Sequence, residues 1–312
     1  MTVRILLYSL MDEFTDKSED QSYANQNRHA MKKENLKEEM LDLFRTCPGN
    51  VVTEENALPG CAGLVMFEEP VFGFADAADP LFQTYKKPQV IGGVYMVPDG
   101  WLSGAKTVVS FFLRFQENVR HSNYGKPEET SPEWLHARIE GQAFLNAYTR
   151  RLKEWFEEQK ITACAPAVDE RFKTGREIKG DDDPEGIHFS SAWSERHAAY
   201  AAGLGTFSLT RGLISKRGMA GRYGSVIISE YIEPDVRSYA GVYDYCIRCG
   251  ACIKRCPVNA ISLEHGKNQS LCREWVEDVT AVRYKPRYGC GKCQTQVPCE
   301  AACPGLRALT HS

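Results

Sequence analysis

The stretch Cys246-Ile-Arg-Cys249-Gly-Ala-Cys252-Ile-Lys-Arg-Cys256-Pro257 decides how the last quarter of this 312-residue chain is built. Its C-x2-C-x2-C-x3-C-P spacing suits a 4Fe-4S cubane, because three thiolates two residues apart can surround one cluster on a tight loop. The fourth thiolate lies one helical turn further on and points toward a second cluster. The sequence therefore predicts a second cysteine run.

That run is Cys290-Gly-Lys-Cys293-Gln-Thr-Gln-Val-Pro-Cys299-Glu-Ala-Ala-Cys303-Pro304, which has the same ending and a longer middle gap. With Cys272 between the runs, nine of the twelve cysteines lie within 58 residues. Two 4Fe-4S clusters need eight thiolates, so one of the nine is spare. A zinc site is the alternative, since C-x2-C pairs also bind zinc, but the four-cysteine spacing favours a cubane.

Two allocations of the cysteines are open. In the first, Cys272 is spare and the clusters are held by Cys246, Cys249, Cys252 and Cys303, and by Cys256, Cys290, Cys293 and Cys299. In the second, Cys272 replaces Cys299. We favour the second, because the gap containing Val297 and Pro298 interrupts the compact loop that a third ligand needs. The predicted ligands are then Cys246, Cys249, Cys252, Cys256, Cys272, Cys290, Cys293 and Cys303.

Composition indicates a globular protein of about two domains, with 43% hydrophobic residues and a net charge of -3. Free thiols and clusters indicate a reducing compartment, so we expect a cytoplasmic protein. The first ten residues are too short an apolar run for a signal sequence, and no run of 18 apolar residues predicts a membrane span. Residues 246–312 carry ten Lys or Arg and five Asp or Glu, which would compensate the charge of two anionic clusters or form a docking patch.

The remaining chain predicts a layered core of helices and strands. Ser131 and Pro132 are typical of a helix start, and apolar residues recur at helical spacing to about residue 159. On this helix we expect His136 and Glu140 to face solvent. A further helix is predicted over 34–44, and strands are predicted over 107–115, 161–168 and 221–230.

Residues 190–205 have the pattern of a capped helix that ends at Gly203-Leu204-Gly205. The two glycines permit positive φ and a close approach of the backbone to a ligand. A β-rich segment, Gly221-Arg222-Tyr-Gly224-Ser225, follows.

In this order, the motifs resemble those of the epoxyqueuosine reductase and reductive dehalogenase superfamily. They are Glu195-Arg-His-Ala-Ala-Tyr-Ala-Ala-Gly203-Leu204-Gly205, then Arg222-Tyr-Gly224-Ser225-Val, the first cysteine run, Cys272, and Gly289-Cys-Gly-Lys-Cys-Gln. The resemblance covers about residues 107–304 and supports Cys272 as a ligand.

The resemblance implies an α+β protein with a nitroreductase-like layered α/β core domain over 1–235 and a ferredoxin-like two-cluster domain over 236–312. It also implies base-off cobalamin, to which electrons pass from two 4Fe-4S clusters. The residues expected at this cofactor are Gly203, Leu204, Gly205, Arg222, Gly224 and Ser225.

The sequence departs from the family in three places. The stretch that carries an aspartate proton donor in epoxyqueuosine reductases has no acid here, so His188 becomes the candidate proton donor. Thr206-Phe-Ser-Leu-Thr replaces a Trp-x-Gly-Lys-Asn segment, and the sequence ends eight residues after Pro304, before any tRNA-binding repeat. These departures argue against tRNA as the substrate.

We therefore expect an oxidoreductase that takes electrons from a low-potential donor such as ferredoxin or flavodoxin and reduces a small molecule. The main alternative is a non-enzymatic electron-transfer protein, or a reductive activator of another corrinoid protein. A flavin on a nitroreductase-like fold is a third possibility.

Overall fold

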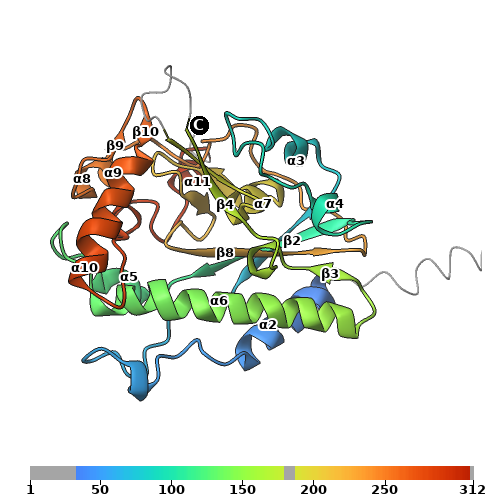
Figure 1. Cartoon of the computed structure of the whole chain (residues 1–312), viewed down its shortest axis with the longest axis horizontal. Helices are drawn as coiled ribbons and strands as arrows, with labels where there is room; N and C mark the ends of the chain where they lie inside the picture. The colour runs from blue at the N-terminus through green and yellow to red at the C-terminus, as the bar shows by residue number, and fades with distance from the viewer. Residues whose placement is uncertain (1–32, 179–186, 310–312) are drawn as a thin grey trace, which may run out of the picture.

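A four-stranded antiparallel sheet forms the centre of the protein (Figure 1). The structure, a computed structural model, describes residues 33–178 and 187–309, without the side chains of 175–178, 187–189 and 307–309. In sheet order the strands are β1 (Val71–Asp76), β2 (Thr107–Arg114), β8 (Gly221–Ile228) and β3 (Ala163–Cys164). The β-branched and aromatic residues of β2 are buried on both faces, as the predicted central strand requires. The strand predicted over 161–168 is reduced to β3, because Pro166 begins a 3-10 turn (Pro166–Val168).

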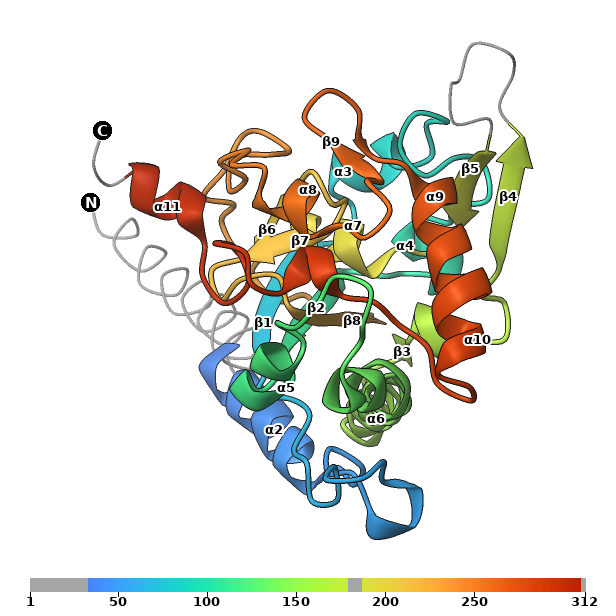
Figure 2. The ribbon, with the colours of Figure 1, turned by 90° about the vertical axis from the view of Figure 1, so that its left-hand side faces the viewer.

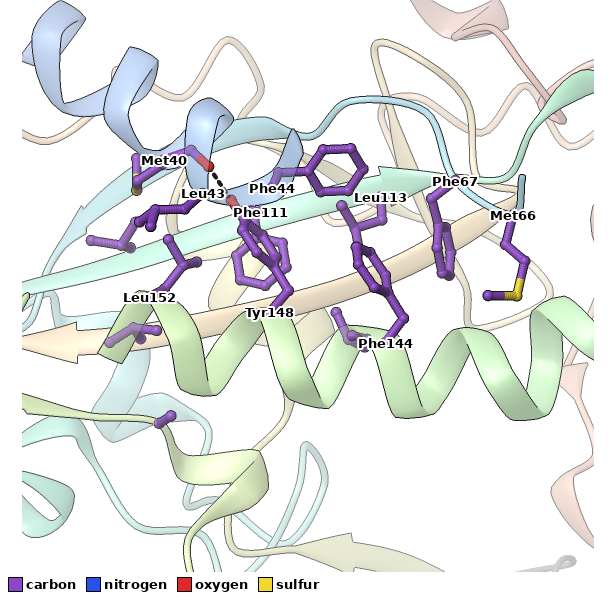
Figure 3. Packing of buried hydrophobic residues seen from close by; sticks show 14 of the residues in the cluster. Met40, Leu43, Phe44, Met66, Phe67, Phe111, Leu113, Phe144, Tyr148 and Leu152 are labelled. Atoms are coloured by element: carbon purple, nitrogen blue, oxygen red, sulfur yellow. Dashed lines mark hydrogen bonds between the residues drawn. The ribbon is translucent and has the colours of Figure 1, made fainter. Parts of the chain in front are cut away.

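Two helices cover one face of the sheet, the long α6 (Pro132–Glu158) and α2 (Lys33–Thr46) (Figure 2). The Ser131 side chain caps α6 by accepting a hydrogen bond from the Trp134 amide at 3.2 Å, as predicted. Figure 3 shows Phe144 and Tyr148 of α6 beneath α2, where the Tyr148 hydroxyl donates to the Met40 carbonyl at 2.8 Å. Each such buried side chain contributes about 1.5–3 kcal/mol to this core.

Shorter elements lie on the opposite face of the sheet. They are α3 (Pro80–Thr84), α4 (Pro98–Trp101), β4 (Thr174–Ile178), β5 (Ile187–Ser191), α7 (Glu195–Ala201), β6 (Gly205–Phe207) and β7 (Leu213–Ser215). Trp193 lies in an aromatic group on this face, stacked on Phe82 and Tyr95 with ring centroids 6.0 and 5.8 Å away. The helix predicted from residue 190 begins only at Glu195, because residues up to Ser191 pair with β4.

The cysteine-rich segment lies across one end of the sheet (Figure 1). It contains α8 (Ala251–Arg255), β9 (Ile261–Ser262), β10 (Gly266–Lys267), α9 (Gln269–Glu274), a π-helical turn (Trp275–Thr280), α10 (Ala281–Arg283), a 3-10 turn (Lys292–Gln294) and α11 (Pro304–Leu309). The short helix α5 (Glu117–Ser122) and a 3-10 turn (Glu54–Asn56) complete the elements of the described residues.

This segment is packed on the start of α6 and the loop before it. The Asn123 side-chain amide donates to the Cys290 carbonyl at 2.9 Å, and the Thr130 hydroxyl donates to the Gly289 carbonyl at 2.8 Å. Gly291 has φ +69°, and a Cβ there would lie 2.0 Å from the ring of Trp134. Only glycine allows this approach, so the second cysteine run is held against the core.

The structure thus confirms a protein of mixed helices and antiparallel strands, with the cysteine-rich segment packed on the core. The nitroreductase-like layering and the boundary between 235 and 236 stay predictions. Within the described residues, no helix is long and apolar enough to cross a membrane.

Candidate functional site

Four cysteines, which we call the outer set, line one small cavity. They are Cys246, Cys249, Cys252 and Cys299. Cys249 is exposed at the surface, whereas Cys252 is buried on α8 beside Leu209 and Val297. Gly250 starts α8 in the left-handed conformation, φ +74°, which lets the chain turn sharply between Cys249 and Cys252. The outer set therefore offers four thiols, of which that of Cys249 lies at the protein surface.

Four other cysteines, the inner set, line a second cavity of about 230 Å³. They are Cys256, Cys272, Cys290 and Cys293. Cys256 follows α8 and points away from the three cysteines before it, as its spacing predicts. Cys272 lies on α9, which Asn268 caps by accepting a hydrogen bond from the Leu271 amide at 2.9 Å. The inner set thus combines cysteines from three separate segments.

The ninth cysteine, Cys303, lines neither cavity and belongs to a buried cluster with Ile214, Met219 and Tyr245, against which Cys246 and Cys299 also pack. The sequence predicts Cys303 as a ligand and Cys299 as spare, whereas here Cys299 lines the outer cavity and Cys303 does not. The reason lies in the Cys293–Cys299 gap, which is a compact turn rather than an interruption. Gln296 adopts φ +58°, and its backbone amide donates to a Glu300 carboxylate oxygen at 2.6 Å. This turn directs Cys299 back to the outer set.

The two sets are neighbours. Cys252 of the outer set and Cys293 of the inner set share an apolar layer with Ile261. Burial raises the pKa of the Cys252 thiol to about 12, and Cys293 and Cys246 add to this effect. Clusters bound at the two sets would therefore lie close together, with Cys252 and Cys293 between them.

Cations gather at the inner cavity, where Arg138, Arg222 and Lys267 line the same space as the inner set. Arg222 donates to the Arg138 carbonyl at 3.1 Å, and burial together with Arg138 lowers the pKa of Arg222 to about 9. Arg222 is thus the one predicted cofactor residue that the structure places at this cavity.

Arg196, on α7, is exposed, and its guanidinium donates to the Arg211 carbonyl. It lines neither of the two cysteine cavities.

The predicted glycines contact the protein's own chain. A Cβ on Gly205 would lie 2.0 Å from the Ile214 carbonyl oxygen, and one on Gly224 would lie 2.4 Å from the Phe111 ring. Gly203 has φ +78°, with the backbone of Val236 and Asp235 as its neighbours. These glycines allow chain segments to pack closely, and Gly205 serves the β6–β7 hairpin.

Leu204 and Ser225 are also held within the core. Leu204 packs with Phe112 and Tyr200. Ser225 and Arg222 lie on opposite faces of β8, since Ser225 bonds α7 whereas Arg222 bonds α6. The six residues predicted at the cofactor therefore do not share one surface.

His188 lies in β5 opposite Glu177 of β4. Its side chain, like the first ten residues considered for a signal sequence, lies outside the described part of the protein. Its role as proton donor stays a prediction.

The structure points to a different acid, Glu195 at the start of α7. The Ser225 hydroxyl donates to Glu195 Oε2 at 2.6 Å, while Oε1 is buried and has no hydrogen-bond partner. Burial raises the pKa of Glu195 to about 8, although the hydrogen bond from Ser225 lowers it. At neutral pH this carboxyl group holds a proton, which makes it a second candidate proton donor.

Glu195→Gln should make stability less dependent on pH. The folded protein binds this proton up to about pH 8, whereas the unfolded chain releases it near the ordinary value of 4.5. Stability should therefore fall as pH rises between these values, by up to about 1.4 kcal/mol per pH unit. Melting temperatures at pH 6, 7 and 8 should fall more steeply for the wild type than for the variant. Parallel curves would contradict the buried acid.

Comparison with known proteins agrees with the cysteine pattern. A family model of the 4Fe-4S binding domain matches residues 241–262. No curated protein matches the chain in sequence.

Among solved structures, the chain is similar to epoxyqueuosine reductase from Streptococcus thermophilus, with 19% identity and a TM-score of 0.44 over 74% of this chain and 62% of that one. Epoxyqueuosine reductase from Bacillus subtilis is 17% identical, with a TM-score of 0.45 over 86% and 66% of the two chains. The catabolic reductive dehalogenase NpRdhA is 15% identical, with a TM-score of 0.48 over 88% and 37%. These are the two kinds of protein that the motifs resemble, and the chain spans less than two thirds of the length of each.

Proposed function

We propose that the protein is an iron–sulfur reductase with two 4Fe-4S clusters, one held by the outer set and one by the inner set. The observation that carries the proposal is the division of eight cysteines between two adjacent cavities. Four thiolates per cavity match the ligand number of a cubane, and the first run has the spacing that sends its fourth cysteine to the other cluster.

The arrangement favours one direction of electron flow. Exposed Cys249 makes the outer cluster the place where a low-potential carrier such as ferredoxin or flavodoxin would deliver electrons. Cys252 and Cys293 would bring the two clusters within reach of each other. The inner cluster would then pass electrons to a molecule bound beside the inner cavity. Reduced thiols and clusters suit the cytoplasm.

We further propose a corrinoid as the group that receives these electrons, because the motifs of the chain resemble those of cobalamin-dependent reductases. Among the described residues, Arg196 and Arg222 donate to the backbone carbonyls of Arg211 and Arg138 and have no carboxylate partner. Arg196, Arg222 and Lys267 would hold the group through its phosphate and amide oxygens. A corrinoid supplies a cobalt ion that changes oxidation state one electron at a time. Glu195 or His188 would supply the proton to a small substrate, and nothing in the site favours tRNA.

Anaerobically purified protein should contain about eight iron and eight sulfide per chain. Metal analysis, sulfide assay and the absorption of the clusters test this result. Protein that carries zinc and negligible sulfide would contradict the cluster assignment.

Protein reconstituted with hydroxocobalamin should retain about one corrinoid per chain after gel filtration. Arg196→Gln should retain less at the same iron content, because it removes a positive charge that would bind the phosphate of the corrinoid. Arg150→Gln, at an exposed position on α6, is the matched control. Full clusters without retained corrinoid would refute the corrinoid and favour the electron-transfer alternative.

A further inference from the structure

The two cavities differ in the charges that line them. Among the described residues, Arg138, Arg222 and Lys267 line the inner cavity, and no carboxylate does. In the same part of the chain, Arg248 is the one charged residue that lines the outer cavity. Two clusters of the same type would therefore lie in different electrostatic surroundings.

Lys267 is held at the inner set by the backbone around it. It pairs with Ile261 in the β9–β10 hairpin, and the next residue, Asn268, caps the helix that carries Cys272. Lys267 lines the inner cavity together with Cys272 and Cys293. A positive charge thus lies in the same cavity as the inner set.

Arg248 provides the contrast at the outer set. It is exposed, and its guanidinium donates to the Leu263 carbonyl. Water and salt screen an exposed charge, whereas the charges of half-buried Lys267 and Arg222 are screened less. Exposure of Cys249 to water also stabilises a reduced outer cluster, but one exposed thiolate is a smaller influence than three cations in one cavity.

We infer that the inner cluster has the higher reduction potential, and that Lys267 is the residue chiefly responsible for the difference. Reduction adds a negative charge to a cluster, and nearby positive charge and hydrogen bonds to its sulfur ligands stabilise that state. One electron would leave the reduced outer cluster and enter the oxidised inner cluster, without any bond being made or broken. The inference rests on the two-cluster part of the proposed function and does not need the corrinoid.

An anaerobic redox titration followed by electron paramagnetic resonance tests the order of the potentials. We expect two one-electron steps, with the inner cluster reduced first. Cys256→Ser should shift or remove the first step, and Cys249→Ser the second, which assigns each step to its cluster. The opposite assignment would overturn the inference while leaving two clusters in place. Protein without two reducible clusters would overturn the proposed function as well.

Substitutions at Lys267 test its role. Lys267→Met should lower the potential of the first step alone and change the equilibrium constant for electron exchange between the clusters at least tenfold, about 59 mV for one electron. Lys267→Arg should restore most of the shift, whereas Lys267→Gln, which is polar but uncharged, should not. Lys254→Met, an equal change of charge at an exposed position on α8, should move neither step. If the potential of the first step does not change in Lys267→Met at unchanged iron content, the role of Lys267 is refuted. If a variant loses iron, the order of the two potentials in the wild-type protein still tests the inference.

Discussion

Cys299→Ser should lose about half of the iron of the protein, whereas Cys303→Ser should keep all of it. Cys299 lines the outer cavity with three other thiols, and its own pKa is raised to about 12 by burial and by Cys246, Cys252 and Cys249. Cys303 instead contacts Tyr245 and Ile214, outside both cavities. Iron and sulfide analysis of the two variants, purified side by side without oxygen, measures the difference.

Cys272→Ser is the companion variant, and it should lose the inner cluster while the outer cluster remains. Spectra of the two iron-poor variants should then add up to the wild-type spectrum. Loss of a cluster from Cys303→Ser, with Cys299→Ser intact, would restore Cys303 as a ligand.

Glu300→Ala should lower the melting temperature by roughly 10 °C and weaken the outer cluster. Glu300 forms an ion pair with Arg120 at 2.8 Å, and both side chains are 6% exposed. Removing one partner of a buried pair costs about 3–5 kcal/mol, which is roughly 10 °C for a protein of this size. The same carboxylate holds the Gln296 amide, so the turn before Cys299 also loses its support.

Two further variants separate the buried charge from general damage. Glu69→Ala removes an exposed partner of Arg45 and should change the melting temperature little. The double variant Arg120→Met with Glu300→Leu should recover much of the loss, because no charge is left unpaired. Equal losses from Glu69→Ala and Glu300→Ala would show that the buried pair has no special role.

Local sequence signals predicted the regular elements of the core and the general position of the clusters. The run over 107–115 became the central strand β2, and the Ser131 cap fixed the start of α6. These features depend on residues close together in the sequence, so residue spacing and composition are enough to predict them. His136 shows where such signals end: it was expected to face solvent, but it is fully buried and accepts a hydrogen bond from the Leu58 amide at 2.9 Å.

Residue roles that depend on distant partners could not be read from the sequence. A glycine that approaches a ligand and one that approaches another strand look alike in sequence, and Gly205 proved to face Ile214. From sequence, the gap with Val297 and Pro298 predicts an interrupted ligand loop. The hydrogen bond from the Gln296 backbone amide to the Glu300 carboxylate, which makes the turn compact, exists only in the folded protein. Lys267 and Glu195 likewise gain their properties from burial against other segments.

The two cysteine runs each lend one residue to the other's cavity, Cys256 to the inner set and Cys299 to the outer set. With two clusters bound as we propose, each cluster would need ligands from both runs, so the binding of one would help to bring the ligands of the other together. Loading of the wild-type chain should then be cooperative, while a variant that lacks one ligand could still hold the cluster whose four ligands remain. Because the second run also rests on Trp134 through Gly291, the loading of iron is tied to the folding of the core.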